Sequence, residues 1–134
     1  MNEDRLADLL RYRIRQADDS LREAGILRDA DAQRGAVNRA YYAMFYALLA
    51  LLATKQLGTS RHSGAISLFD REFVKTGVFA PDLSKALHLA FDRRQIHDYG
   101  EMIDLDAGIS NEAIVDATRF AAAVRQYLTD QGML

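Results

Sequence analysis

The chain has 134 residues, a length at which one hydrophobic core normally serves the whole polypeptide, so we expect residues 1–134 to form a single domain. Seventeen Lys and Arg stand against 19 Asp and Glu, giving a formal net charge of −2. Any contact with nucleic acid must therefore come from a local basic cluster. The absence of cysteine excludes disulfides, thiolate metal sites and a cysteine nucleophile.

The first expected helix begins at an Asn2 N-cap and ends at Gly25, with apolar residues three and four positions apart. The second, at about 31–57, is apolar nearly all round and has a seam of alanines. Such a helix must be covered on several sides, so we expect it at the centre of the fold or also buried by a partner subunit. Its uncharged run, 40–54, is too short to span a membrane.

A third helix is expected at about 60–76, capped by Ser60 and ended by Gly77. A fourth begins near Pro81, and a fifth follows a Ser110 cap. The single proline and the short connections predict an all-α protein, an antiparallel up-and-down bundle of four long helices plus a short fifth. Charges throughout residues 1–15 argue against a signal peptide, so we expect a cytoplasmic protein with no membrane segment.

The fourth helix carries the most informative pattern. Its core stripe includes Leu87 and Ala90. At the same spacing the stripe then continues with four polar residues, Arg94, His97, Asp98 and Glu101, and Arg93 lies beside them. Ionisable groups on a buried or cleft-facing stripe are costly unless paired, so this cluster is a candidate site. The alternative is an exposed helix end with surface ion pairs, such as Arg94 with Asp98.

Four segments carry a family resemblance: residues 39–47 (RAYYAMFYA), 62–69 (HSGAISLF), 73–77 (FVKTG) and 94–100 (RQIHDYG). In this order and approximate spacing they resemble the HEPN domains (higher eukaryotes and prokaryotes nucleotide-binding), and within them a prokaryotic subfamily. The resemblance implies a helical bundle that commonly forms a homodimer and is frequently paired with a minimal nucleotidyltransferase. In some members it also implies cleavage of RNA without a metal or cofactor.

In the ribonuclease members an Arg and a His, four to six residues apart, meet at the dimer cleft, where the Arg steadies the phosphate and the His moves the 2′-hydroxyl proton. The resemblance gives these roles to Arg93 or Arg94 and to His97, with Asp98 in the same cleft. Here the separation is only three or two residues, so two functions stay open. One is a metal-independent endoribonuclease of a toxin–antitoxin or defence-like module, and the other is a non-catalytic module that docks a nucleotidyltransferase.

Three further features have two interpretations each. In toxin members a Tyr two residues after the catalytic His can receive nucleotides from the partner enzyme; Tyr99 holds this position, although it could simply pack in the bundle. Arg61, His62 and Ser63 begin a helix where a phosphate or nucleotide could bind, although helix capping also explains the serines. The tyrosines of the second helix are expected in the core rather than as platforms for bases: Tyr41, Tyr42 and Tyr46.

No His has a Glu three residues before it, so no di-iron site is expected.

Overall fold

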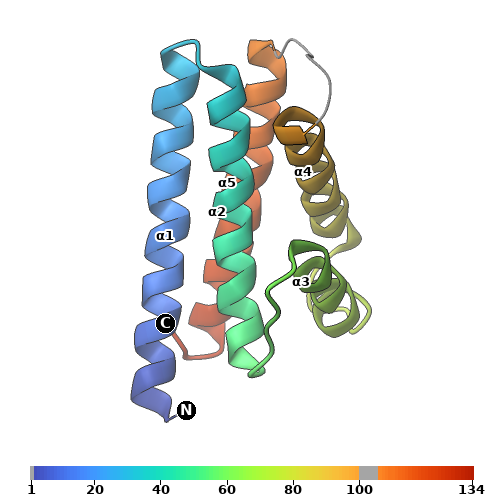
Figure 1. The fold of residues 1–134 in the computed structure, drawn as a ribbon. Coiled ribbons are helices and arrows are strands. Elements are labelled where there is room, and N and C mark those ends of the chain that lie inside the picture. The colour runs from blue at the N-terminus through green and yellow to red at the C-terminus, as the bar shows by residue number, and fades with distance from the viewer. Residues whose placement is uncertain (1, 100–105) are drawn as a thin grey trace.

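A computed structural model describes the backbone of residues 2–99 and 106–134 and the side chains of residues 2–95 and 106–134. It contains α1 (Glu3–Asp29), α2 (Gln33–Thr54), α3 (His62–Phe69), the π-helical turn η1 (Asp70–Val74), α4 (Pro81–Tyr99) and α5 (Ala107–Asp130). The four long helices alternate in direction along the chain, and α3 with η1 lies at one end of the bundle beside α4 (Figure 1). The predicted all-α bundle is confirmed.

The centre of the bundle is α2, which packs against α1, α3, α4 and α5. Its alanine seam is buried along the whole helix, at Ala36, Ala40, Ala43, Ala47 and Ala50, and small side chains let neighbouring backbones approach closely. By length and composition α2 could cross a membrane, but most of it lies inside the protein. A buried central helix of a bundle has the same composition, because it must be apolar on nearly every side.

The expected end of the first helix is wrong by several residues. The first helix continues through Gly25 to Asp29, and the chain turns at Asp31, whose φ is +62°. The amide of Ala32 donates to the carbonyl of Leu27 at 2.7 Å and closes the turn. The turn therefore uses a left-handed aspartate, which tolerates this conformation better than most residues.

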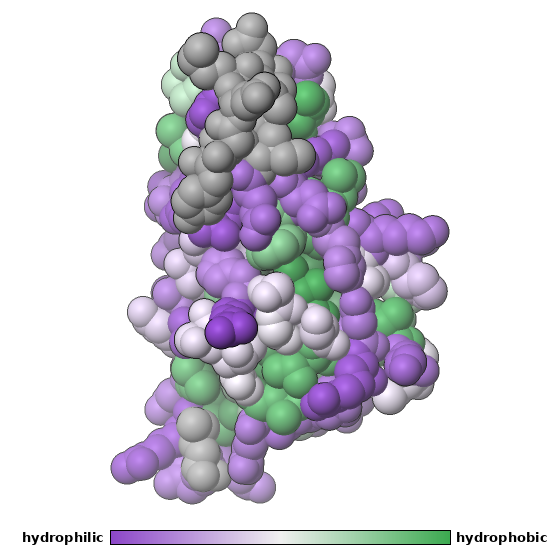
Figure 2. Space-filling view, turned by 45° about the vertical axis from the view of Figure 1, so that its right-hand side comes forward, coloured by the Kyte–Doolittle hydropathy of each residue, from purple (hydrophilic) through white to green (hydrophobic). Residues whose placement is uncertain are grey.

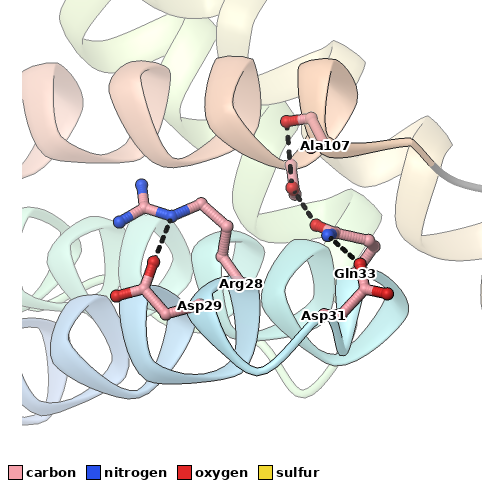
Figure 3. A network of polar contacts seen from close by, with 6 residues as sticks. Arg28, Asp29, Asp31, Gln33 and Ala107 are labelled. Atoms are coloured by element: carbon pink, nitrogen blue, oxygen red, sulfur yellow. Dashed lines mark hydrogen bonds and ion pairs between the residues drawn. The ribbon is translucent and has the colours of Figure 1, made fainter.

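The start of α5 corrects the expected Ser110 cap. Asp106 caps the helix, because its Oδ1 accepts a hydrogen bond from the amide of Ile109 at 2.9 Å. Ser110 lies one turn inside the helix and is buried, and its single hydroxyl proton is within hydrogen-bond reach of both Oε1 of Gln33 and the carbonyl of Ala107. Gln33 in turn donates to Asp31 at 2.9 Å, so the α1–α2 turn is joined to the beginning of α5 (Figure 3).

The expected third helix is divided in two and begins later than predicted. Arg61 is its N-cap residue and no side chain caps α3, so the Ser60 cap is wrong. After Phe69 the backbone widens into η1, where the amide of Lys75 donates to the carbonyl of Asp70 at 2.8 Å. Gly77 has a φ of +81° and follows the end of this turn, as the sequence predicts. Single π turns of this kind occur frequently at functional sites.

Candidate functional site

The candidate site is centred on Arg94, which α4 presents to the aromatic side chains of α2. Nη2 of Arg94 donates to the hydroxyl of Tyr42 at 3.1 Å. The guanidinium carbon also lies 5.4 Å from the ring centroids of both Tyr41 and Tyr42. Each such cation–π contact contributes about 0.5 to 1 kcal/mol at a partly exposed position. The half-buried guanidinium is therefore held in place by the central helix.

His62, the first residue of α3, approaches the same tyrosines. Its Nδ1 lies 2.7 Å from the hydroxyl of Tyr41, and its ring stacks on Phe45 with centroids 4.0 Å apart and planes 11° apart. We call Arg94, Tyr41, Tyr42, Phe45 and His62 the Arg94 cluster. It draws on three helices, with α2 supplying the aromatic surface and α3 and α4 supplying the two cationic or ionisable groups.

Burial and charge both act on the ionisable groups of the Arg94 cluster. Burial raises the pKa of Tyr41 far above its ordinary value, and Arg94 only partly counters this effect. Burial, with a further contribution from Arg94, lowers the pKa of His62. At neutral pH the phenol is therefore protonated and the imidazole is uncharged.

The hydrogen bond between the two residues then sets the tautomer of His62. Tyr41 is 1 % exposed, so its hydroxyl proton needs a protein acceptor, and among the described residues its hydrogen-bond partner is Nδ1 of His62. If the phenol donates to Nδ1, the proton of the neutral imidazole must reside on Nε2. His62 then presents an N–H donor, rather than a proton acceptor, at Nε2.

Arg39 adds a second guanidinium to the cluster. Its guanidinium carbon lies 4.9 Å from the ring centroid of Tyr42, one helical turn away on α2. Two positive charges therefore lie near one tyrosine ring. The sequence reasoning did not single out Arg39; the available signal was its place three residues before Tyr42 on the same helix face.

The structure separates the two neighbouring arginines of α4. Arg93 turns to α5, where its Nη2 lies 3.3 Å from a carboxylate oxygen of Glu112, whereas Arg94 turns to α2. His97, Asp98 and Tyr99 lie in the last turns of α4, but their side chains are outside the described residues, and Glu101 is outside them entirely. Their expected convergence with Arg94 stays a prediction.

The second predicted group is spread over the start of α3. Arg61 and Ser63 are exposed, whereas His62 is half-buried and turned to Tyr41. A cavity of about 420 Å³ adjoins His62, and its lining includes the hydroxyl residues Thr59 and Ser60 and Arg13 of α1. Where side chains are described, no three His, Asp or Glu residues are grouped so that they could hold a metal ion.

The tyrosines of α2 divide between core and surface. Tyr41 is buried, as predicted, but Tyr42 and Tyr46 are only half-buried. Tyr42 also packs its ring edge against the imidazole of His62, with centroids 5.9 Å apart. The aromatic side chains of α2 thus serve both the core and the Arg94 cluster.

The fold and the Arg94 cluster together define a helical bundle whose central helix holds a guanidinium and an imidazole against a row of aromatic rings. The chain belongs to the HEPN domain family, whose model matches residues 10–127. The resemblance predicted from the four sequence segments is confirmed.

Several relatives cover most of this chain. A protein of Thermotoga maritima named "UPF0332 protein" is 37% identical over 122 residues, which are 91% of this chain and 92% of the relative. A protein of Methanocaldococcus jannaschii named "Putative toxin MJ0142" is 31% identical over 121 residues, 90% of this chain and 82% of the relative. A second protein of that organism, "Putative toxin MJ0605", is 36% identical over 64% of each chain.

Proposed function

We propose that this HEPN protein is the toxin-like component of a prokaryotic two-component module and that it binds RNA or a nucleotide at the Arg94 cluster. The observation that carries the proposal is the half-buried guanidinium of Arg94, held against Tyr41 and Tyr42 on the face of α4 that leads one turn later to His97. The names of the two Methanocaldococcus relatives support the toxin-like role. In this proposal the protein acts in the cytoplasm.

The chemistry of the cluster suits a phosphate ligand. A guanidinium is permanently charged and its forked N–H groups match two phosphate oxygens, and the bond to Tyr42 reduces the conformational freedom that binding would cost. Arg39 adds positive charge over the ring of Tyr42, and the Nε2–H of His62 adds a neutral donor.

If the protein cleaves the RNA that it binds, the resemblance to the ribonuclease members of the family indicates the following reaction. The 2′-hydroxyl attacks the adjacent phosphorus, and His97 accepts the hydroxyl proton. The bond from phosphorus to the 5′-oxygen breaks and that oxygen takes up a proton from water, so that a 2′,3′-cyclic phosphate and a 5′-hydroxyl remain. Arg94 stabilises the charge that develops on the phosphate oxygens. His62 is a poor alternative base, because its pKa is lowered and its Nδ1 faces Tyr41.

The test is RNA cleavage in EDTA by the purified protein, with end-group analysis for cyclic phosphate. We expect His97→Ala to lower the rate by about 10² to 10⁴, the usual contribution of a positioned acid or base. Arg94→Ala should abolish most activity and Arg94→Lys should restore only part, because an ammonium cannot fork. Arg22→Ala, an exposed arginine on α1, is the matched control and should behave like the parent. A parent protein that binds neither RNA nor a nucleotide contradicts the proposal.

A second function is favoured by a specific observation. Arg94 joins α4 to α2 and Arg93 joins α4 to α5, so both guanidiniums take part in holding the bundle together. In a non-catalytic module that docks a minimal nucleotidyltransferase, Arg94→Ala lowers the melting temperature and His97→Ala changes little. Incubation with the partner enzyme and ATP tests whether Tyr99 is modified. If Tyr99 accepts the nucleotides, the parent protein gains mass and Tyr99→Phe does not.

We also propose that the protein forms a homodimer through α2 and α4. A half-exposed apolar stripe on α2 remains after the bundle has formed, at Tyr42, Tyr46, Leu49 and Ala53, and Leu89 on α4 is 39 % exposed. Hydrophobic patches interrupt the hydrophilic surface on the side that carries α3 and α4 (Figure 2). Sedimentation equilibrium at tens of micromolar, a range that detects roughly micromolar dissociation constants, should give the dimer mass, and a monomer alone would contradict it.

The start of α3 is proposed as an additional phosphate contact. Arg61 is the N-cap residue of α3 and is followed by His62, which belongs to the Arg94 cluster, and by the exposed Ser63. Arg61→Ala combined with His62→Ala should weaken binding of a labelled nucleotide while the circular dichroism spectrum stays helical. Unchanged nucleotide affinity in the folded double variant would remove these residues from the site.

A further inference from the structure

A basic groove lies outside the Arg94 cluster, between η1 and the first turns of α4. It has a volume of about 640 Å³, and its polar lining consists of Ser67, Asp70, Arg71, Lys75, Ser84 and Lys85. Val74 and Pro81 complete the lining with apolar surface. A volume between about 300 and 1,000 Å³ is typical of sites for small ligands.

The lysines of the chain are concentrated in this region. There are only three, and two of them, Lys75 and Lys85, line the groove. The third, Lys55, is held differently: its Nζ donates to the carbonyl of Glu72 at 3.3 Å and lies 4.9 Å from the ring centroid of Phe73. Lys55 is therefore a natural control, since it is an exposed lysine beside η1 that does not line the groove.

Among the described residues the groove is lined by a single carboxylate, Asp70, and both of its oxygens already have hydrogen-bond partners. Oδ1 of Asp70 accepts from the hydroxyl of Ser84 at 2.6 Å, and Oδ2 lies 2.7 Å from Nε2 of His88. Asp70 is also half-buried, whereas Lys75 and Lys85 are exposed. The carboxylate is thus engaged by Ser84 and His88, both on α4.

The groove therefore gathers more positive than negative charge. Neither Lys75 nor Lys85 forms an ion pair with a described residue, and Arg71 forms only a long one with Glu72, at 3.7 Å. Arg71 and Lys75 are four residues apart on one turn, an arrangement in which like charges repel. An anion between these cations relieves the repulsion and gains their attraction.

We propose that this groove is a second anion site, which binds a phosphate group carried by a nucleotide or by an RNA strand. Arg71 supplies a forked donor, Lys75 and Lys85 supply point charges, and the exposed hydroxyl of Ser67 supplies a neutral donor. The apolar surface of Val74 and Pro81 packs against the sugar. The site does not depend on the proposed function, because it shares no residue with the Arg94 cluster.

Lysine acylation followed by mass spectrometry tests the site directly, since the chain has only three lysines to follow. The probes are inorganic phosphate, AMP and an eight-nucleotide RNA, each tested up to millimolar concentration. We expect AMP or RNA to protect Lys75 and Lys85 but not Lys55. If RNA protects them and AMP does not, the ligand is an RNA strand. If only inorganic phosphate protects them, the phosphate is not carried by a nucleotide or by RNA, and the proposal is wrong. Equal protection of all three lysines, or none with any probe, overturns the proposal.

Charge variants give an independent measurement. Lys75→Gln with Lys85→Gln should weaken binding of the protective probe at least tenfold, whereas Lys55→Gln should not change it. Asp70→Asn keeps an acceptor for Ser84 and removes the negative charge, so it should tighten binding several-fold. If RNA is the ligand, losing the contact with one phosphate should make the log–log salt slope shallower by about 0.7. A folded double variant with parental affinity overturns the proposal.

Discussion

Replacing Tyr41 with Phe removes a single hydroxyl from the Arg94 cluster and leaves the ring in place. Tyr41 is 1 % exposed, and its ring contacts Phe45 and Phe91, contacts that Phe keeps. The loss is the 2.7 Å hydrogen bond to His62, whose net contribution to stability is about 0.5 to 1.5 kcal/mol. For 134 residues the entropy of unfolding is about 0.28 kcal/mol/K, so the melting temperature should fall by about 2 to 5 °C.

The same substitution tests the tautomer of His62, because the two possible hydrogen bonds have opposite effects on its pKa. If Tyr41 donates to Nδ1, it stabilises the neutral imidazole, and removing the hydroxyl raises the pKa of His62. If Tyr41 accepts from an Nδ1–H, it stabilises the protonated imidazolium more strongly, and removing the hydroxyl lowers the pKa. The sign of the change therefore distinguishes the two arrangements.

The assay is a pH titration of the imidazole signals of parent and Tyr41→Phe by NMR, with nitrogen shifts to identify the tautomer. We expect a higher pKa for His62 in the variant and an Nε2–H tautomer in the parent. Tyr46→Phe, which changes a half-buried hydroxyl on the same helix, is the control and should leave the titration of His62 unchanged. A lower pKa in Tyr41→Phe would refute the assigned donor.

Three further predictions concern stability. His62→Gln removes a titrating group whose pKa is lowered in the folded protein. The parent should therefore lose stability relative to this variant as pH falls from about 6.5 through the folded pKa. Parallel plots of unfolding free energy against pH from 7.5 to 5 would contradict this. Asp106→Ala should cost about 1 kcal/mol in urea unfolding, since it removes the cap of α5, whereas Asn111→Ala should cost less. Phe120→Ala, at a fully buried ring, should cost about 3 to 5 kcal/mol by the same measurement, and a loss below 1 kcal/mol would refute its place in the core.

The sequence predicts the helices well because their apolar residues repeat with helical spacing. Pro81 marks the start of α4 correctly, since its fixed φ and missing N–H suit a first helical position. The sequence does not rank two capping residues that lie four positions apart. Asp106 caps α5, and Ser110 is used instead in a buried contact with Gln33, which no local pattern reveals.

The candidate site is less predictable because its contacts join distant positions. Helical spacing correctly places Arg94 on a partly buried face, but it cannot say that this face meets Tyr42, 52 residues earlier. It also cannot tell that Arg93, the next residue, turns to Glu112 on another helix. His62 was predicted only as part of a phosphate-binding helix start, whereas packing against Phe45 makes it part of the aromatic cluster.

The short turn between α1 and α2 has a consequence for the order of folding. The two helices share the most extensive contact in the bundle, and only residues 30–32 separate them, so they can pair after closing a very short loop. The contact between Gln33 and Ser110 bridges 77 positions and can form only when α5 arrives. Weakening the α1–α2 interface, as in Leu27→Ala, whose side chain lies beside Gly35 of α2, should therefore slow refolding, whereas Ser110→Ala should mainly accelerate unfolding.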